Sequence, residues 1–295
     1  MRFGHHQSFY LRVNWLSKAI RMLLEDEQGA RFFYDDFGFE RIGLGRNMVK
    51  SLKFWSLATG VIAEAKNEEG RPINVITPFG QLMHRHDRFI RLPLTSGLLH
   101  YFLASNRDQA TTWYWFFNEY ASRSATNEEL HAALTEWTRQ QTSKTVSAGS
   151  LKKDLDCLRQ LYTIRSRQED DPEEVVASPL TGLHLLHEIK EQFVKRTPEL
   201  MDVSIEALYF ALLVYCQRSQ VSSVTLEELQ YKPLLWGKMF NLSSNHILDA
   251  LTQLEADPRY PVHFVRTNQI YNLTVEAEDP YAFLEKAYEW KAAAR

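Results

Sequence analysis

The sequence predicts a mainly α-helical protein with small β-hairpins, an α+β fold built from tandem winged-helix or helix-turn-helix modules. Three observations lead to this prediction. Apolar residues recur at helical spacing along much of the chain, two pairs of short strand-like segments interrupt that pattern, and each pair follows a group of helical segments. Helices followed by a hairpin is the order of a winged helix, so we expect one such module near each end.

The chain is long enough for more than one module. It has 295 residues, 44% of them hydrophobic, and can therefore bury a substantial core. We divide it into an N-terminal winged-helix DNA-binding domain (1–92), a middle helical domain that resembles a helix-turn-helix (93–167), an acidic linker (168–177) and a C-terminal winged-helix-like domain (178–295). The linker contains the run QEDDPEE, which is typical of a solvated segment.

The N-terminal domain is expected to hold three helices and a hairpin. Apolar side chains at helical spacing define the first helix, and an acidic stretch before Gly29 predicts its end. A polar segment rich in Gly and Pro, residues 67–72, predicts the turn of the hairpin. We expect helices over residues 9–24, 30–37 and 43–60, and strands over residues 60–65 and 73–78.

The remaining two domains show similar patterns. Thr126 and Glu129 have the Thr-x-x-Glu spacing of a capping box. Five consecutive aromatic residues, 113–117, must wrap around a helix, so we expect core packing there, with base stacking as the alternative. We expect a helical pair over residues 94–122, helices over residues 126–141, 150–162, 178–193, 205–218 and 242–254, and strands over residues 262–266 and 269–275.

Composition excludes several classes of protein. The two cysteines, Cys157 and Cys216, stand alone on helical segments, so neither a disulfide framework nor a zinc site of paired cysteines is available. The N-terminus lacks a long apolar region, and no stretch approaches the roughly 18 apolar residues of a membrane-spanning helix. We therefore expect a cytoplasmic protein without a membrane partner.

Charge is unevenly distributed along the chain. The net charge of −3 does not by itself indicate a nucleic-acid partner. Residues 1–60 nevertheless carry nine Lys or Arg against six Asp or Glu, and the excess lies after Glu40. The N-terminal domain is therefore the best candidate for contact with phosphates.

The segment from Gly43 to Gly60 is the predicted recognition helix. Arg46, Lys50 and Lys53 share one helical face, opposite a face of apolar side chains. Arg46 and Asn47 suit the edges of guanine and adenine, and the helix N-terminus suits a phosphate. The alternative is an ordinary solvated helix with basic residues. The predicted DNA-contacting residues are Arg12, Gly45, Arg46, Asn47, Lys50, Ser51, Lys53, Arg85 and Arg88.

Several segments together resemble the SspB family of DNA nickases from single-strand phosphorothioation systems. They are residues 6–12 (HQSFYLR), 44–51 (LGRNMVKS), 99–101 (LHY), 113–118 (WYWFFN), 153–158 (KDLDCL), 178–180 (SPL) and 279–280 (DP), with Trp15 and Leu16. The resemblance spans nearly the whole chain, and residues 43–49 are its most specific part.

The resemblance implies an activity and partners. It implies that the protein nicks one strand of duplex DNA so that sulfur enters the backbone, as part of antiviral defence. The implied partners are double-stranded DNA, a cysteine desulfurase, an ATPase and a reductase-like sulfur-transfer protein.

Two clusters are candidates for the chemistry of nicking, which usually needs a divalent metal such as Mg²⁺ or Mn²⁺. One is Tyr34, Asp35 and Asp36, with Glu40 four residues on; the ordinary role of the two aspartates would be capping or solvation. The other is His84, His86 and Asp87, where the histidines could act jointly only on a strand. The family is expected to carry an acidic aspartate–proline stretch here; residues 87–91 (DRFIR) depart from it and favour contact with the DNA backbone. Neither cluster matches a nuclease signature.

Three hypotheses follow. The first is a DNA-nicking endonuclease, and the second is a non-catalytic DNA-binding regulator or an adaptor that recruits a modification enzyme. The third is a scaffold for protein interactions, because winged helices also bind proteins and the chain is mildly acidic.

Overall fold

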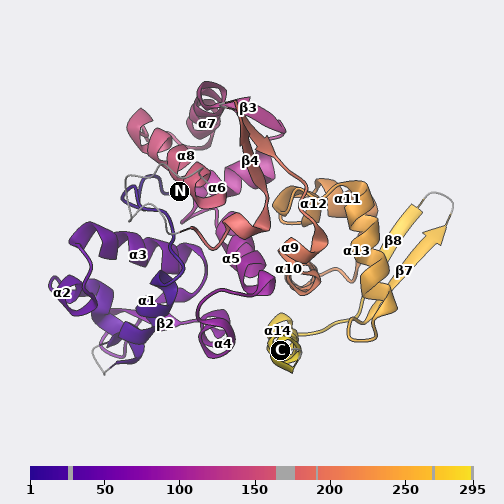
Figure 1. The fold of residues 1–295 in the computed structure, drawn as a ribbon, viewed down its shortest axis with the longest axis horizontal. Helices are drawn as coiled ribbons and strands as arrows, with labels where there is room; N and C mark the ends of the chain where they lie inside the picture. The colour runs from indigo at the N-terminus through magenta and orange to yellow at the C-terminus, as the bar shows by residue number, and fades with distance from the viewer. Residues whose placement is uncertain (26–28, 164–176, 191, 268–269, 294–295) are drawn as a thin grey trace.

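Helices make up most of the fold, and three small antiparallel sheets lie among them in the described part of this computed structural model (Figure 1). The structure describes residues 1–25, 29–163, 177–190, 192–267 and 270–293. The predicted α+β class is therefore confirmed. Most of the acidic linker falls outside the described residues. Within the part of the chain that is described, no helix is long and apolar enough to cross a bilayer.

The N-terminal part follows the predicted order of helices and a hairpin. Its elements are α1 (Trp15–Leu24), the 3-10 helix η1 (Gly29–Tyr34), α2 (Gly38–Ile42), α3 (Arg46–Ala58), β1 (Ile62–Lys66), β2 (Pro72–Ile76) and α4 (Pro78–Asp87). The hairpin pairs Ile62 with Ile76 and Lys66 with Pro72. Two predictions are wrong: the first helix begins at Trp15 rather than at residue 9, and the helix expected over residues 30–37 ends at Tyr34, with a separate helix beginning at Gly38.

The middle part contains a sheet that the sequence did not predict. Its elements are α5 (Pro93–Ser105), α6 (Thr111–Tyr114), the π-helix η2 (Trp115–Glu119), β3 (Ser124–Thr126), α7 (Asn127–Gln141), α8 (Ala148–Tyr162), the 3-10 helix η4 (Thr181–Leu183), β4 (Leu186–Ile189) and β5 (Gln192–Lys195). The helix expected over residues 178–193 is wrong, because β5 pairs with β3 as well as with β4. This hairpin therefore completes the sheet of the middle helices.

The C-terminal part has the same order of elements. They are α9 (Leu200–Val203), α10 (Ile205–Ser219), β6 (Ser223–Thr225), α11 (Leu226–Tyr231), α12 (Trp236–Met239), α13 (Ser244–Ala256), β7 (Val262–Thr267), β8 (Ile270–Val275) and α14 (Pro280–Ala293). The predicted C-terminal hairpin is confirmed. In both three-stranded sheets the first strand pairs with the third, giving the orders β3-β5-β4 and β6-β8-β7.

In the middle and C-terminal sheets, the helix after the first strand begins with a capping box. Thr126 accepts a hydrogen bond from the Glu129 amide, and the Glu129 carboxylate accepts one from the Thr126 amide. Thr225 and Glu228 form the same reciprocal pair. Each box satisfies amide donors that the first turn of a helix leaves unpaired. The predicted capping box is thus confirmed, and the structure contains it twice.

Helix α5 lies at the centre of the fold, between the N-terminal part and the C-terminal helices (Figure 1). A Cβ at Gly97 would lie 2.5 Å from the carbonyl oxygen of Val203, so only glycine lets α5 approach α9 this closely. The aromatic run 113–117 is buried apart from the half-buried Tyr114, which confirms the expected core packing.

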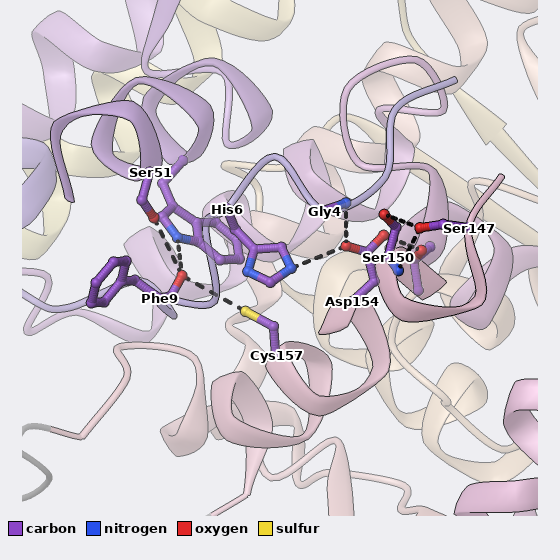
Figure 2. Close-up of polar contacts among 10 residues, drawn as sticks. Gly4, His6, Phe9, Ser51, Ser147, Ser150, Asp154 and Cys157 are labelled. Atoms are coloured by element: carbon purple, nitrogen blue, oxygen red, sulfur yellow. Dashed lines mark hydrogen bonds and ion pairs between the residues drawn. The ribbon is translucent and has the colours of Figure 1, made fainter. Parts of the chain in front are cut away.

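The first ten residues, which we call the N-terminal strap, lie between α3 and α8 (Figure 2). The carbonyl oxygen of Phe9 accepts hydrogen bonds from Ser51 and Trp55 of α3, at 3.3 and 2.9 Å, and lies 3.8 Å from the Cys157 sulfur of α8. Nearer the chain start, His6 and Gly4 contact Asp154 of α8. The strap therefore joins the N-terminal and middle parts.

Candidate nucleic-acid interface

The N-terminal end of α3 is open and exposed. Gly43 ends α2 with a φ of 66°, and Gly45 occupies the cap position of α3 in an extended conformation. A Cβ at either glycine would meet no atom within 4 Å. Among the described residues no side chain caps the helix, so its first amides are available to an anion.

Two cations lie beside these amides. Arg46 and Lys50 are exposed, and Asn47 is exposed between them. The guanidinium carbon of Arg46 lies 4.7 Å from the ring centroid of Phe39 in α2, which restricts the arginine without neutralising it. The opposite face of α3 is buried through Leu52 and Trp55. The predicted arrangement of a cationic face opposite an apolar face therefore holds at this end of the helix.

Lys53 is less available than its position in the sequence predicts. Its ammonium lies 3.7 Å from the ring centroid of Tyr34 and 3.6 Å from the Glu64 carboxylate of β1. Burial lowers the pKa of Lys53, an effect that Glu64 opposes, and burial together with Glu64 raises the pKa of Tyr34. This three-residue cluster joins α3, η1 and β1, so a phosphate would have to compete with Glu64 for the lysine.

Two other residues predicted to contact DNA support the fold instead. Ser51 is fully buried and donates to Phe9, so its hydroxyl is not presented to a ligand in this conformation. Arg12 is half-buried, and its guanidinium carbon lies 5.8 Å from the Trp15 ring centroid.

Asp35 and Asp36 are exposed at the junction of η1 and α2. The Asp35 carboxylate accepts a hydrogen bond of 2.9 Å from the Phe37 amide, which is the turn-forming role that the sequence offered as the alternative. Asp36 has an exposed side chain. The pair therefore presents adjacent carboxylates to solvent, one of them partly occupied by the turn.

His84 and His86 lie on helix α4, so the condition for their joint action, a strand at this position, is not met. Thr77 accepts from the Gly80 amide at 3.0 Å and Pro78 follows it, so the chain begins α4 where a strand was expected to continue. Residues two apart on a helix point in different directions. His86 stacks on the Tyr288 ring of α14, with centroids 5.5 Å apart.

Asp87 and Arg85 are engaged within the protein. The buried Asp87 carboxylate accepts from the amides of Arg91 and Leu92, at 2.9 and 2.8 Å, so it caps the next turn of the chain rather than facing a ligand. Arg85 lies 3.4 Å from Glu285 of α14. Arg88, by contrast, is exposed.

The two predicted catalytic clusters do not meet. The Asp35 and Asp36 junction precedes α2, the other cluster ends α4, and these helices lie in separate regions of the N-terminal part (Figure 1). Throughout the described ranges, no group of three or more His, Cys, Asp or Glu side chains is placed to hold a metal ion. A ready-made metal centre is therefore not part of the described structure.

A groove of about 690 Å³ lies elsewhere, between the start of α5 and helices α9, α10, α13 and α14. Its polar lining includes Glu199, Asp249 and the buried Glu206, whose carboxylate lies 2.7 Å from the Lys291 ammonium. The sequence did not predict this groove, because its walls come from five separate helices. Its acidic lining makes it a poor site for phosphate.

The sequence also did not predict which residues of other elements contact the cations of α3. Phe39, Tyr34 and Glu64 hold two of the predicted cations, yet each lies on a different element from α3. The clustering of aromatic residues before α3, at positions 32–34, 37 and 39, was the available signal.

Comparisons with known proteins give a family and a fold. The profile of a family described as protein of unknown function (DUF4007) matches residues 3–288. The chain resembles the crystal structure of SspB and that of magnesium ion-bound SspB, with TM-scores of 0.83 and 0.84. In each comparison the two sequences are 21% identical, and the aligned region covers 97% of this chain and 88% of the SspB chain. No curated protein matches. The resemblance to SspB predicted from sequence is confirmed at the level of the fold.

Proposed function

Because the chain belongs to the DUF4007 family and has the fold of SspB, we propose that it binds duplex DNA and nicks one strand in a phosphorothioation system. The proposed partners are double-stranded DNA and a cysteine desulfurase, an ATPase and a reductase-like sulfur-transfer protein of the same system. The nick would give that machinery access to the backbone, as part of antiviral defence in the cytoplasm.

The open N-terminus of α3 is the observation that supports DNA binding. Free helix amides, Arg46 and Lys50 share one exposed end, and Asn47 lies between the two cations. Amides and cations together bind phosphate, while Arg and Asn side chains read base edges in a major groove. We interpret α3 as the recognition helix of an N-terminal winged helix whose wing is the β1–β2 hairpin. The middle and C-terminal sheets, with their shared strand order, are interpreted as two further winged helices.

Magnesium is the proposed cofactor, since one SspB structure is magnesium ion-bound. The described residues do not form a cage for it, because no three metal-ligating side chains converge. Mg²⁺ commonly binds through one or two carboxylates plus phosphate oxygens and water. Asp35 and Asp36 are the exposed carboxylates that suit such a site, and we derive no catalytic step through the metal.

Plasmid nicking tests the enzymatic part of the proposal. The purified protein should convert supercoiled plasmid to open circles with Mg²⁺ or Mn²⁺, and EDTA should stop the reaction. Asp35, Asp36, His84 and His86 are each replaced by alanine in turn. At least one of these four variants should lose nicking. A matched control is Glu227→Ala, an exposed carboxylate on α11 outside the proposed set. Plasmid that stays supercoiled with either metal would rule out intrinsic nicking.

A non-catalytic adaptor is the second candidate. It is favoured because the acidic cluster before α2 and the histidine cluster on α4 lie apart and do not form one site. An adaptor would bind duplex DNA through α3 and deliver a partner enzyme. It predicts salt-dependent binding without cleavage, and nicking that appears only when a partner protein is added.

A further inference from the structure

The connection between α4 and α5 displays an exposed aromatic ring between two arginines. Arg88, Phe89 and Arg91 are exposed, and Phe89 retains 42% of its accessible surface. Large apolar side chains that protrude singly are common. This ring differs because charged groups flank it in a connection whose backbone is fixed.

Three contacts fix that backbone. Asp87 is 5% exposed, and its two carboxylate oxygens accept from the amides of Arg91 and Leu92. The Asp87 carbonyl accepts from the Ile90 amide at 2.9 Å. Ile90 has a φ of 52°, a strained conformation for a β-branched residue, while its side chain is buried and anchors the turn. We call residues 88–91 the Arg-Phe turn.

The charges of the Arg-Phe turn are not neutralised locally. The guanidinium carbons of Arg88 and Arg91 lie 5.0 and 5.7 Å from the Phe89 ring centroid. Neither arginine forms an ion pair with a residue that the structure describes, whereas Arg85 is paired with Glu285. The acid next to the turn, Asp87, is buried, and its carboxylate accepts hydrogen bonds from backbone amides. The turn thus holds two exposed cations beside an exposed aromatic side chain.

We infer that the Arg-Phe turn binds a single-stranded stretch of DNA, with Phe89 stacking on an unpaired base and the two arginines holding the adjacent phosphates. Bases within a duplex are already stacked, so the ring gains a partner only at a gap, a frayed end or a displaced strand. Aromatic stacking and guanidinium contacts are the two components of single-strand binding sites. The inference rests on the proposed function and names the form of DNA that this turn selects.

The test compares three fluorescent oligonucleotides by anisotropy: a 20-nucleotide oligo(dT), a 20-base-pair duplex, and the same duplex with a four-nucleotide gap. Phe89→Leu keeps an apolar side chain but removes the planar ring. This variant should bind the single strand and the gapped duplex about tenfold more weakly, and the intact duplex within twofold of the parent protein. Arg88→Gln/Arg91→Gln should lower the salt dependence of single-strand binding.

Controls separate this inference from the proposed function. Arg46→Ala/Lys50→Ala should weaken binding to the intact duplex. If the parent protein binds no duplex, the proposed DNA function fails. If the α3 variant loses duplex binding while Phe89→Leu binds the single strand and the gapped duplex as the parent does, only the inference about the Arg-Phe turn is overturned. Unchanged thermal unfolding of each variant confirms that the fold is retained.

One alternative ligand is tested in the same experiment. Arginines beside an exposed phenylalanine also suit an anionic membrane surface. Vesicles of 30% phosphatidylserine and 70% phosphatidylcholine should not bind the protein measurably. Phe89-dependent binding to these vesicles, without any preference for single-stranded over duplex DNA, would overturn the inference.

Discussion

The imidazole Nε2 atom of His6 lies 3.0 Å from the Oδ1 atom of Asp154, and both side chains are buried (Figure 2). Asp154 also accepts from the Gly4 amide at 2.7 Å and from the Thr112 hydroxyl at 2.6 Å. One carboxylate therefore receives donors from the N-terminal strap and from α6. This contact fixes how the N-terminal part, which carries α3, sits against the middle helices.

We expect Asp154→Ala to destabilise the protein by about 3 kcal/mol, because it leaves two buried donors and one half-buried donor without an acceptor. The measurement is the free energy of unfolding in urea. The control is Asp156→Ala, two residues along α8, whose exposed contact with Arg159 spans 3.8 Å and should contribute less than about 1 kcal/mol. Equal losses in the two variants would contradict the role assigned to Asp154.

Removing the two exposed cations of α3 should weaken duplex binding and change its salt dependence. We expect Arg46→Ala/Lys50→Ala to lose at least about tenfold in affinity, and the slope of log K against log salt to fall by about 2. The matched control is Lys232→Ala on the C-terminal side of the molecule, where the lysine pairs with Glu228. A slope unchanged in the α3 variant would show that these cations do not meet phosphates.

Gly45→Asp should separate stability from DNA binding. A side chain at this position meets no atom within 4 Å, and the backbone is already extended as a cap requires. Aspartate should cap α3 and raise the free energy of unfolding by up to about 1 kcal/mol, while its charge repels phosphate. Gly45→Ser adds a cap without the charge. Duplex affinity should therefore fall several-fold in the aspartate variant and much less in the serine variant.

His100 should make stability depend on pH. It is fully buried, its Nε2 donates to the Met239 carbonyl at 2.6 Å, and its Nδ1 accepts from the Tyr162 hydroxyl at 2.7 Å. Burial lowers the pKa of His100 to about 4, from 6.5 in an unfolded chain. The folded state thus holds the neutral ring, and its stability is complete above pH 6.5 and lost as the pH falls toward 4.

The expected loss from this group between pH 7.5 and pH 5 is about 2 kcal/mol. Urea unfolding at both pH values measures it, and His100→Gln should show a smaller difference between them than the parent protein. If the free energy of unfolding falls equally between the two pH values in both proteins, groups other than His100 cause the acid sensitivity.

Local chemistry in the sequence predicted several elements well. The capping box of Thr126 and Glu129, the alternation that formed the C-terminal hairpin, and the apolar stripe of α8 each depend on residues within a few positions of one another. The same holds for α3, where Arg46 and Lys50 are one helical turn apart. Such patterns report on structure directly, because their partners are close in the chain.

The predictions that failed depended on partners far away in the sequence. Residues 178–193 have a helical pattern, yet Phe193 pairs with Ala125 and the segment becomes a hairpin. The sequence pattern predicts a strand that includes Thr77 and Pro78, yet Thr77 caps α4 and Pro78 begins it.

The sequence by itself determined the α+β class, the order of helices and hairpin in the N-terminal and C-terminal parts, and a cationic helix face near the N-terminus. The tertiary structure alone decided which of the polar and charged residues considered for a site remain exposed. It buries Ser51 and Asp87, pairs Lys53 with Glu64 and Arg85 with Glu285, and leaves Arg46, Lys50, Arg88 and Arg91 exposed. The physical reason is that periodicity assigns a residue to a face, whereas burial and ion pairing depend on which distant element packs against that face.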